Sequence, residues 1–396
     1  MLSERARSLR AAIVGAGIGG LTAAIALRQA GVPVTVLERA TALREIGAGL
    51  LLAANAQKAL RELGLSESVG ELGTNATMGE IRSWQGTVLA TIPIGELEVR
   101  AGAASAAVHR AELQGVLMKA LGEEPLCLGS ECVGFEHYKR GVRVLLANGS
   151  EEHADLLIGA DGLHSTVRER LFGAEEPRYA GYTAWRAVAE PGGDLVPWGT
   201  GFESWGRGVR FGCAHIGKGR IYWFAAKNAP EGEKDGEVGS PDGPKRTLLR
   251  LFRGWHQPIE KLIAATAETA IRRDDLYDRE PLERWGEGRV TLLGDAAHPM
   301  TPNLGQGASL AIEDAVVLAR CLTQGPDGRP DAPKALRRYE ELRRERTAAM
   351  VRRSRLVGRV GQLENPLLCG LRNLAFRVTP SRLYARQAEQ VVGWEV

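Results

Sequence analysis

A glycine-rich loop near the start of the chain has the residue types and spacing of a phosphate-binding turn: Gly15-Ala16-Gly17-Ile18-Gly19-Gly20. In this G-x-G-x-x-G pattern the first glycine permits a tight turn, the second lets the backbone approach a pyrophosphate, and the last lets a helix pack closely on a strand. Glu38, followed by Arg39, ends the next apolar stretch, where a carboxylate can bind ribose hydroxyls. The loop predicts a dinucleotide site and leaves FAD and NAD open, with a ligand-free glycine turn as the alternative.

Two later stretches share one order of features: an apolar strand, then a carboxylate, then a glycine loop. Residues 156–168 place Asp161 after the first of these strands, and residues 292–307 place Asp295 after the second, ahead of another helix. A plain NAD-dependent dehydrogenase explains the first glycine loop but gives no reason for these two stretches. These two stretches therefore need an explanation other than a plain NAD-dependent dehydrogenase.

The elements that would position these residues follow from hydrophobic periodicity. Strands are predicted over 11–14, 33–37 and 289–295, and helices over 19–30, 56–63, 110–121, 307–320, 334–359 and 380–396. Residues 179–226 change to short alternating runs rich in Tyr, Trp, Phe and Arg, which predicts an antiparallel sheet. A polar loop is expected over 227–244. Nucleotide-binding character lies on both sides of the aromatic sheet, so that sheet is predicted to be inserted.

In their order and spacing the three stretches resemble the class A flavoprotein monooxygenases, the para-hydroxybenzoate hydroxylase-like aromatic hydroxylases, over roughly residues 10–350. The resemblance implies an α/β fold: a Rossmann-type FAD-binding domain, an inserted, mainly antiparallel β-sheet substrate domain and a C-terminal helical segment. We expect the FAD-binding domain over 8–78, 98–178 and 285–330, the substrate domain over 79–97 and 179–284, and C-terminal helices over 331–396.

The resemblance also implies that FAD is bound without a covalent bond. Its implied contacts are the four loop glycines with Glu38 and Arg39 for the ADP half, Arg110 for the pyrophosphate, Asp161 for both FAD and the pyridine nucleotide, and Asp295 for the ribityl chain.

The loop that ends in a predicted helix start has a physical role in this scheme. Pro299, Gly305 and Gly307 punctuate it, and backbone N–H groups at a helix N-terminus would face the flavin edge where negative charge develops. An ordinary helix-start loop is the alternative.

The activity implied by the resemblance is hydroxylation of a small aromatic substrate. NADH or NADPH would reduce the flavin, dioxygen would add to it, and the C4a-hydroperoxide would transfer a hydroxyl group. An oxidase, epoxidase or halogenase of the same fold, and a non-enzymatic flavin-binding protein, are the alternatives. The chain departs from the family pattern at Ala54-Asn55, which weakens inference about the loop at Gly47 to Gly49.

Candidate substrate residues lie in the aromatic sheet. By alternation Arg210, Gly212 and Ala214 share one face, and Tyr222 and Phe224 of the partner strand could face the same cavity. Arg210 would suit an anionic substrate, and Tyr222 could hydrogen-bond or help deprotonate a phenolic oxygen. Structural roles are the alternative for both residues, and one is favoured for His215 and His298.

The overall composition excludes several classes of function. A formal net charge of +3 over 396 residues gives no reason to expect nucleic acid as a partner. The five cysteines are scattered without C-x-x-C spacing, which indicates reduced thiols and no metal site. No signal peptide or spanning segment is evident, so a cytoplasmic location is expected. The basic stretch 334–359 is interpreted as a solvated helix face rather than a membrane site. Substrate identity, the choice of NADH or NADPH, and oligomeric state are left open.

Overall fold

The computed structural model of the protein describes residues 9–43, 49–75, 77–122, 125–190, 192–323 and 331–393. Gly47, part of the loop singled out above, lies outside these residues, as do residue 8 and residues 394–396 at the edges of the expected domains.

A five-stranded parallel sheet forms the nucleotide-binding half, with the order β18-β12-β1-β2-β8. Its strands are β1 (Ala11–Val14), β2 (Val34–Glu38), β8 (Leu126–Leu128), β12 (Leu156–Gly159) and β18 (Val290–Leu292). Strands β18, β12 and β1 are buried throughout, as continuous apolar runs require when helices or other strands cover both faces. The predicted strands over 11–14, 33–37 and 289–295 are confirmed.

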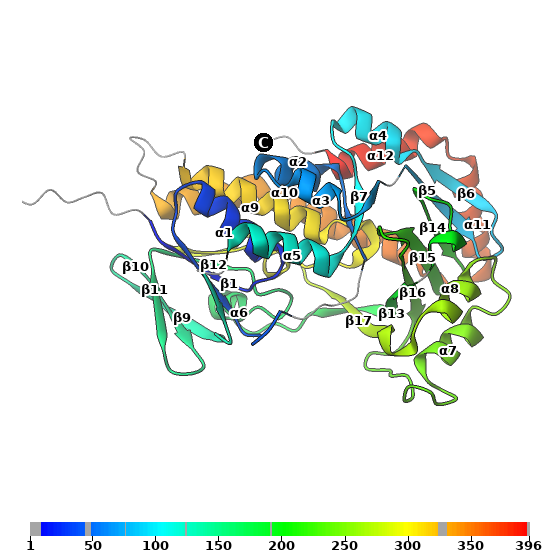
Figure 1. Ribbon diagram of the computed structural model, residues 1–396, viewed down its shortest axis with the longest axis horizontal. Helices are drawn as coiled ribbons and strands as arrows, with labels where there is room; N and C mark the ends of the chain where they lie inside the picture. The colour runs from blue at the N-terminus through cyan, green and yellow to red at the C-terminus, as the bar shows by residue number, and fades with distance from the viewer. Residues whose placement is uncertain are drawn as a thin grey trace, which may run out of the picture.

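Long helices cover this sheet (Figure 1). They are α1 (Ile18–Gln29), α2 (Ala54–Glu62), α5 (Arg110–Leu121), α9 (Gly307–Thr323) and α10 (Ala332–Gly361). Helix α1 packs on α5 and α9, and α9 packs in turn on α2 and α10. Because α1 and α9 are covered on most sides, their apolar residues run almost all round each helix.

A seven-stranded sheet forms the second half, with the order β17-β13-β16-β15-β14-β5-β6. Its strands are β5 (Met78–Ser83), β6 (Val88–Ile92), β13 (Arg178–Ala189), β14 (Thr200–Trp205), β15 (Val209–His215), β16 (Ile221–Asn228) and β17 (Arg272–Asp278). Every neighbouring pair is antiparallel except β14 with β5. The predicted antiparallel sheet is confirmed.

The two faces of this sheet differ in chemistry. Phe211 and Trp223 point to one face, where they form a buried core with α7 (Pro244–Leu251) and α8 (Ile259–Ala265). Strand alternation therefore turns Arg210, Tyr222 and Phe224 to the opposite face. The register pairs Gly212 with Phe224 and Ala214 with Tyr222, so the predicted shared face is confirmed.

Smaller elements complete the fold. They are a sheet of β3 (Gly49–Leu52), β4 (Thr74–Asn75) and β7 (Ala106–His109), a sheet of β9 (Cys132–Tyr138), β10 (Gly141–Leu146) and β11 (Glu151–Ala154), and the helices α3 (Ser66–Gly70), α4 (Ile94–Ala101), α6 (Thr166–Phe172), α11 (Pro366–Val378) and α12 (Ser381–Val392). Within the described residues, no helix combines the length and apolarity needed to cross a membrane. The whole is the mixed α/β architecture expected from the sequence.

Candidate active site

The glycine loop joins β1 to α1 at the carboxyl edge of the parallel sheet. Gly15 adopts a φ of +104°, and a Cβ there would lie 2.4 Å from the carbonyl oxygen of Ala160, so the turn requires glycine. A Cβ on Gly20 would lie 1.9 Å from the Gly15 oxygen, whereas one on Gly19 would meet the Leu293 side chain at 2.8 Å. These two glycines permit close packing.

Gly17 differs from its neighbours because it opens onto free space. It precedes the first turn of α1, and no described atom beyond its chain neighbours lies within 4 Å of a Cβ placed there. A helix N-terminus with exposed N–H groups and room in front of it can accept a phosphate. The loop therefore fits the pyrophosphate of a dinucleotide.

Glu38 ends β2 beside this loop. Its carboxylate accepts hydrogen bonds from the backbone N–H groups of Ala16 at 2.7 Å and Ala40 at 2.9 Å, and Arg39 is exposed next to it. From the other side, the Gln114 amide of α5 donates to the Ala16 carbonyl at 3.2 Å. Sequence reasoning missed Gln114, although it lies one helical turn after Arg110 and thus on the same face.

Arg110 and Asp295 lie close enough for the charge of each to affect the pKa of the other. Both side chains are exposed to water, yet protein atoms enclose them: burial raises the pKa of Asp295, opposed by His298 and Arg110, and burial lowers the pKa of Arg110. We infer that Arg110 and Asp295 line one hollow in the surface, because water reaches both side chains although protein surrounds them. The structure thus brings Asp295 of the third motif to the arginine that begins α5.

Asp161 lies at the end of β12, next to the glycine loop, and anchors the start of α6. Its carboxylate accepts from the Ser165 hydroxyl at 2.5 Å and from the backbone N–H of Val167 at 3.2 Å. Burial raises the pKa of Asp161, and these hydrogen bonds oppose the shift. Arg168 in turn donates to the carbonyls of Ala296 and Ala297, both at 3.3 Å, which ties the second motif to the third.

The loop from 299 to 307 leads into α9. Pro299 is buried, Gly305 has a left-handed φ of +61°, and Gly307 begins the helix with its Cβ position 3.7 Å from an Asp295 carboxylate oxygen. The N–H groups of the first turn of α9 therefore open toward the hollow that contains Asp295.

A buried network of ionic and hydrogen-bonded groups joins α9 and α10 to the backbone and side chains next to Asp295. Asp314 of α9 accepts from the backbone N–H of Gly294 at 3.1 Å, from the His298 Nε2 at 2.6 Å, and from the Nε of Arg343 on α10 at 2.7 Å. Burial alone would raise the pKa of Asp314, but His298 and Arg343 lower it overall. The bond to Asp314 agrees with the structural role favoured for His298. The signal for Asp314 was a pair of adjacent carboxylates inside an apolar helix.

The aromatic face of the seven-stranded sheet contacts β3. Tyr222 packs against the β3 backbone so closely that a Cβ on Gly49 would lie 2.3 Å from its ring. Burial raises the pKa of Tyr222 to about 12, and Arg186 of β13 acts in the opposite direction. The charge of Arg186 also helps to lower the pKa of Arg110. Sequence reasoning missed Arg186, which by alternation shares the face of Tyr222.

Arg210 lies deeper on this face. It is 2% exposed, and its guanidinium donates to Glu203 at 2.9 Å, Gln362 at 2.7 Å and Asn303 at 2.8 Å. These bonds tie the sheet to the end of α10 and to the 299–307 loop. A contact between Arg210 and an anionic substrate remains a prediction.

Comparison with known proteins identifies the family. A family model described as FAD binding domain matches residues 8–186 and 257–354, and the aurachin C monooxygenase/isomerase of Stigmatella aurantiaca is 44% identical over 93% of this chain and 94% of its own length. The chain belongs to the class A flavoprotein monooxygenases. It is similar to the 3-amino-4-hydroxybenzoate 2-monooxygenase of Streptomyces cremeus, at 38% identity over 94% of this chain and 93% of the relative. Klebsiella pneumoniae HpxO complexed with FAD and uric acid superposes with a TM-score of 0.89 at 31% identity, covering 97% of this chain and 96% of the other.

The hollow of this FAD-dependent monooxygenase fits its cofactor. Free space in front of Gly17, the guanidinium of Arg110 and the enclosed carboxylate of Asp295 offer partners for phosphates and for hydroxyl groups. The family match leaves out residues 187–256, which include β14, β15, β16 and α7. This part of the monooxygenase contains Arg210, Tyr222 and Phe224.

Proposed function

We propose that this monooxygenase uses NADH or NADPH and dioxygen to hydroxylate a small planar aromatic or heteroaromatic molecule held against the face that contains Tyr222 and Phe224. Two contacts with one strand carry the proposal: the Tyr222 ring packs against β3 at Gly49, and a Cβ on Gly305 of the 299–307 loop would lie 3.7 Å from Leu51 of the same strand. The groove that fits FAD and the aromatic sheet face therefore border the same hollow, so a molecule on that face would lie beside the cofactor.

Two of the similar proteins support a planar substrate. The name of one states that it acts on 3-amino-4-hydroxybenzoate, and HpxO was solved with uric acid bound. Both compounds are flat rings with polar substituents. An aromatic sheet face with a few polar groups suits that chemistry.

Bound FAD supplies the redox chemistry that activates dioxygen for insertion. The protein's own residues bind, orient and shield. Phe224 offers a flat apolar surface, and Tyr222, whose pKa lies at about 12, is a neutral phenol that can donate a hydrogen bond to a substrate oxygen. The first turn of α9 offers N–H groups toward the hollow, where they stabilise negative charge.

The test is anaerobic mixing of the FAD-loaded protein with NADH and with NADPH, in the presence and absence of candidate aromatic compounds, followed by oxygen. We expect one compound to accelerate flavin bleaching and to be recovered with one added hydroxyl oxygen. Flavin that neither nucleotide reduces under any condition contradicts the proposal. An epoxide, or peroxide released without oxygen insertion, points to the alternative activities of the fold.

A further inference from the structure

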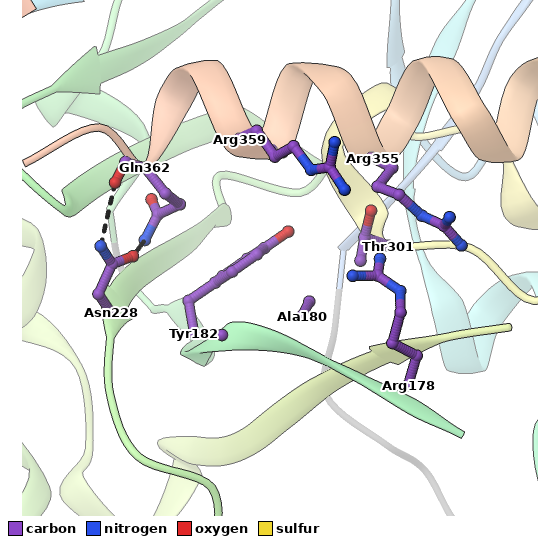
Figure 2. Close-up of a pocket in the computed structure, with 10 residues that line it drawn as sticks. Arg178, Ala180, Tyr182, Asn228, Thr301, Arg355, Arg359 and Gln362 are labelled. Atoms are coloured by element: carbon purple, nitrogen blue, oxygen red, sulfur yellow. Dashed lines mark hydrogen bonds between the residues drawn. The ribbon is translucent and has the colours of Figure 1, made fainter. Parts of the chain in front are cut away.

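A separate pocket lies between β13 and the C-terminal part of α10 (Figure 2). It has a volume of about 220 Å³, and three arginines, Arg178, Arg355 and Arg359, line it together with Tyr182 and Thr301. None of its lining residues belongs to the flavin or substrate contacts assigned above. The pocket therefore needs its own explanation.

Two of these arginines share one carboxylate. Arg178 donates to the Asp278 oxygens at 2.8 and 2.6 Å, and Arg355 donates to the same two oxygens at 3.0 and 3.2 Å. Asp278 is 0% exposed. Glu280 also pairs with Arg355, but its side chain is 65% exposed and its charge is screened by water. One carboxylate inside the protein thus faces two guanidinium groups.

Arg359 adds a third positive charge. It is exposed on α10, and among the residues that the structure describes it has no hydrogen bond or ion pair. Figure 2 shows its guanidinium extending below α10 toward Thr301, while that of Arg178 rises from β13 toward the same residue. The Nη1 of Arg178 also has no described partner, because its Nε and Nη2 are taken by Asp278. Free cationic donors converge on one space.

The pocket adjoins the loop expected beside the flavin. Thr301 belongs to that loop, and the Asn303 amide donates to the Tyr182 hydroxyl at 2.9 Å and to the Ser354 carbonyl at 2.9 Å. A group held in the pocket would therefore lie against the back of the 299–307 loop.

We propose that this arginine pocket binds a phosphate group, and that the phosphate belongs to the pyridine nucleotide that reduces the flavin. The proposal rests on the proposed function for its choice of ligand. Guanidinium groups bind phosphate oxygens through paired charge-assisted hydrogen bonds. At about 220 Å³ the space suits one phosphate with its neighbouring atoms, since pockets for whole drug-sized ligands measure roughly 300–1,000 Å³.

The sequence supports separate phosphate sites for FAD and for the pyridine nucleotide. G-x-G-x-x-G occurs once in the chain, at Gly15 to Gly20, and that loop fits the pyrophosphate of FAD. The phosphates of NADH or NADPH must therefore bind to some other group of donors. The arginine pocket offers them next to the loop that the nicotinamide has to approach.

The first experiment titrates the FAD-loaded protein with inorganic phosphate at constant ionic strength in a calorimeter. Arg359→Gln removes the unpaired guanidinium, and Arg382→Gln, at an exposed arginine on α12 outside the pocket, is the matched control. We expect binding of one phosphate to the parent protein, weakened roughly tenfold in Arg359→Gln by the loss of one charge-assisted hydrogen bond, and unchanged in the control. A parent protein that does not bind phosphate, or equal binding in all three, overturns the site.

The second experiment identifies the source of the phosphate. Anaerobic flavin reduction is measured against NADH and NADPH concentration in the same three proteins. We expect Arg359→Gln to raise the half-saturating nucleotide concentration roughly tenfold without changing the limiting rate. Weakened phosphate binding with unchanged nucleotide saturation overturns the nucleotide assignment and leaves free phosphate as the ligand. If neither nucleotide reduces the parent flavin, the proposed function fails, whereas the phosphate titration still decides the pocket.

Discussion

The hydroxyl of Tyr222 is the titratable group on the aromatic sheet face whose protonation state bears most directly on the proposed reaction. With a pKa of about 12, it stays protonated up to about pH 11, and so acts as a hydrogen-bond donor and not as a base. The proposed chemistry therefore needs its O–H group and not its charge.

Tyr222→Phe removes only that O–H group. We expect the hydroxylation rate to fall roughly tenfold or more, because one oriented hydrogen bond to the substrate is lost, while FAD affinity stays unchanged. The measurement is the rate of product formation at saturating nucleotide, with the exposed Tyr138→Phe as control. Equal rates in both variants would remove Tyr222 from the site.

Asp314 is buried in the core, where it binds the backbone of Gly294 and the side chains of His298 and Arg343. The buried Arg343 pairs with two buried carboxylates, those of Glu313 and Asp314, and Asp314→Asn would remove one of these two charges. We expect a loss of about 3–5 kcal/mol in the free energy of unfolding, measured by denaturant titration. The exposed pair Arg338–Glu341 provides the control, since Glu341→Gln should cost less than about 1 kcal/mol.

The same carboxylate gives a pH dependence of known sign. The pKa of Asp314 is lower in the folded protein than its ordinary value near 3.9. Its stabilising contribution is therefore fully present above about pH 4 and is lost as the pH falls through the folded pKa. Unfolding curves between about pH 3 and 7 should show an acid-side loss of stability that is smaller in Asp314→Asn.

At the scale of elements, the turn between β1 and α1 contains two kinds of glycine. Gly20 is needed for close packing, whereas Gly17 faces the space proposed for a ligand. Gly17→Ala meets no described atom, so we expect a normal thermal midpoint without FAD but FAD affinity weakened roughly tenfold or more by the methyl group in the phosphate space. Gly115→Ala, which also meets nothing within 4 Å on the exposed side of α5, is the control and should bind FAD normally.

Gly20→Ala should behave in the opposite way. Its methyl group would lie 1.9 Å from the Gly15 carbonyl oxygen, which is backbone and has no room to move. We expect a lower thermal midpoint even before FAD is added. Unchanged FAD affinity in Gly17→Ala would show that the open space is not where phosphate binds.

The elements that the sequence predicted are those with a strong local signal. The apolar strands of the parallel sheet, α1, α5, α9 and the alternating strands β15 and β16 follow from periodicity and glycine punctuation. Helix α11 was not predicted: Leu367, Leu371 and Leu374 are exposed on it, so its apolar pattern does not mark a buried face. The sheet of β9, β10 and β11 was also missed, although Val142, Val144 and Leu146 alternate along β10 and lie in the core.

The candidate site was predictable where a motif fixes the backbone and unpredictable where the fold brings distant residues together. Glu38 ends β2, and Asp161 and Asp295 follow the ends of β12 and β18 in the same parallel sheet, which sequence context alone indicates. The partners of Arg210, by contrast, come from β14, the 299–307 loop and the end of α10, and no local pattern relates these segments.

At the scale of the whole molecule, Arg210 links the seven-stranded sheet to the end of α10 and to the 299–307 loop. Arg210→Leu would break its bonds to Glu203, Gln362 and Asn303 at once. We expect a loss of roughly 2–4 kcal/mol and a thermal midpoint lowered by roughly 2–5 °C, because a buried charge pair loses one partner. The check is calorimetry beside substrate saturation, with Arg207→Leu at a nearby exposed arginine as control.

The two measurements separate a structural Arg210 from a substrate-binding one. A lowered midpoint identifies the coupling role described here. An unchanged midpoint with a raised KM for an anionic substrate would instead assign Arg210 to the substrate alone.

The strand order of the parallel sheet also sets when a newly made chain can become an enzyme. Its central strands come from residues 11–14 and 156–159, but β18, next to Asp295, ends only at residue 292. At ~5–20 residues per second, a ribosome needs on the order of half a minute to produce that last strand after the glycine loop has emerged. Until then the groove lacks one wall. Acquisition of the cofactor is thus a late event in biosynthesis, and chains released before β18 is made should remain colourless.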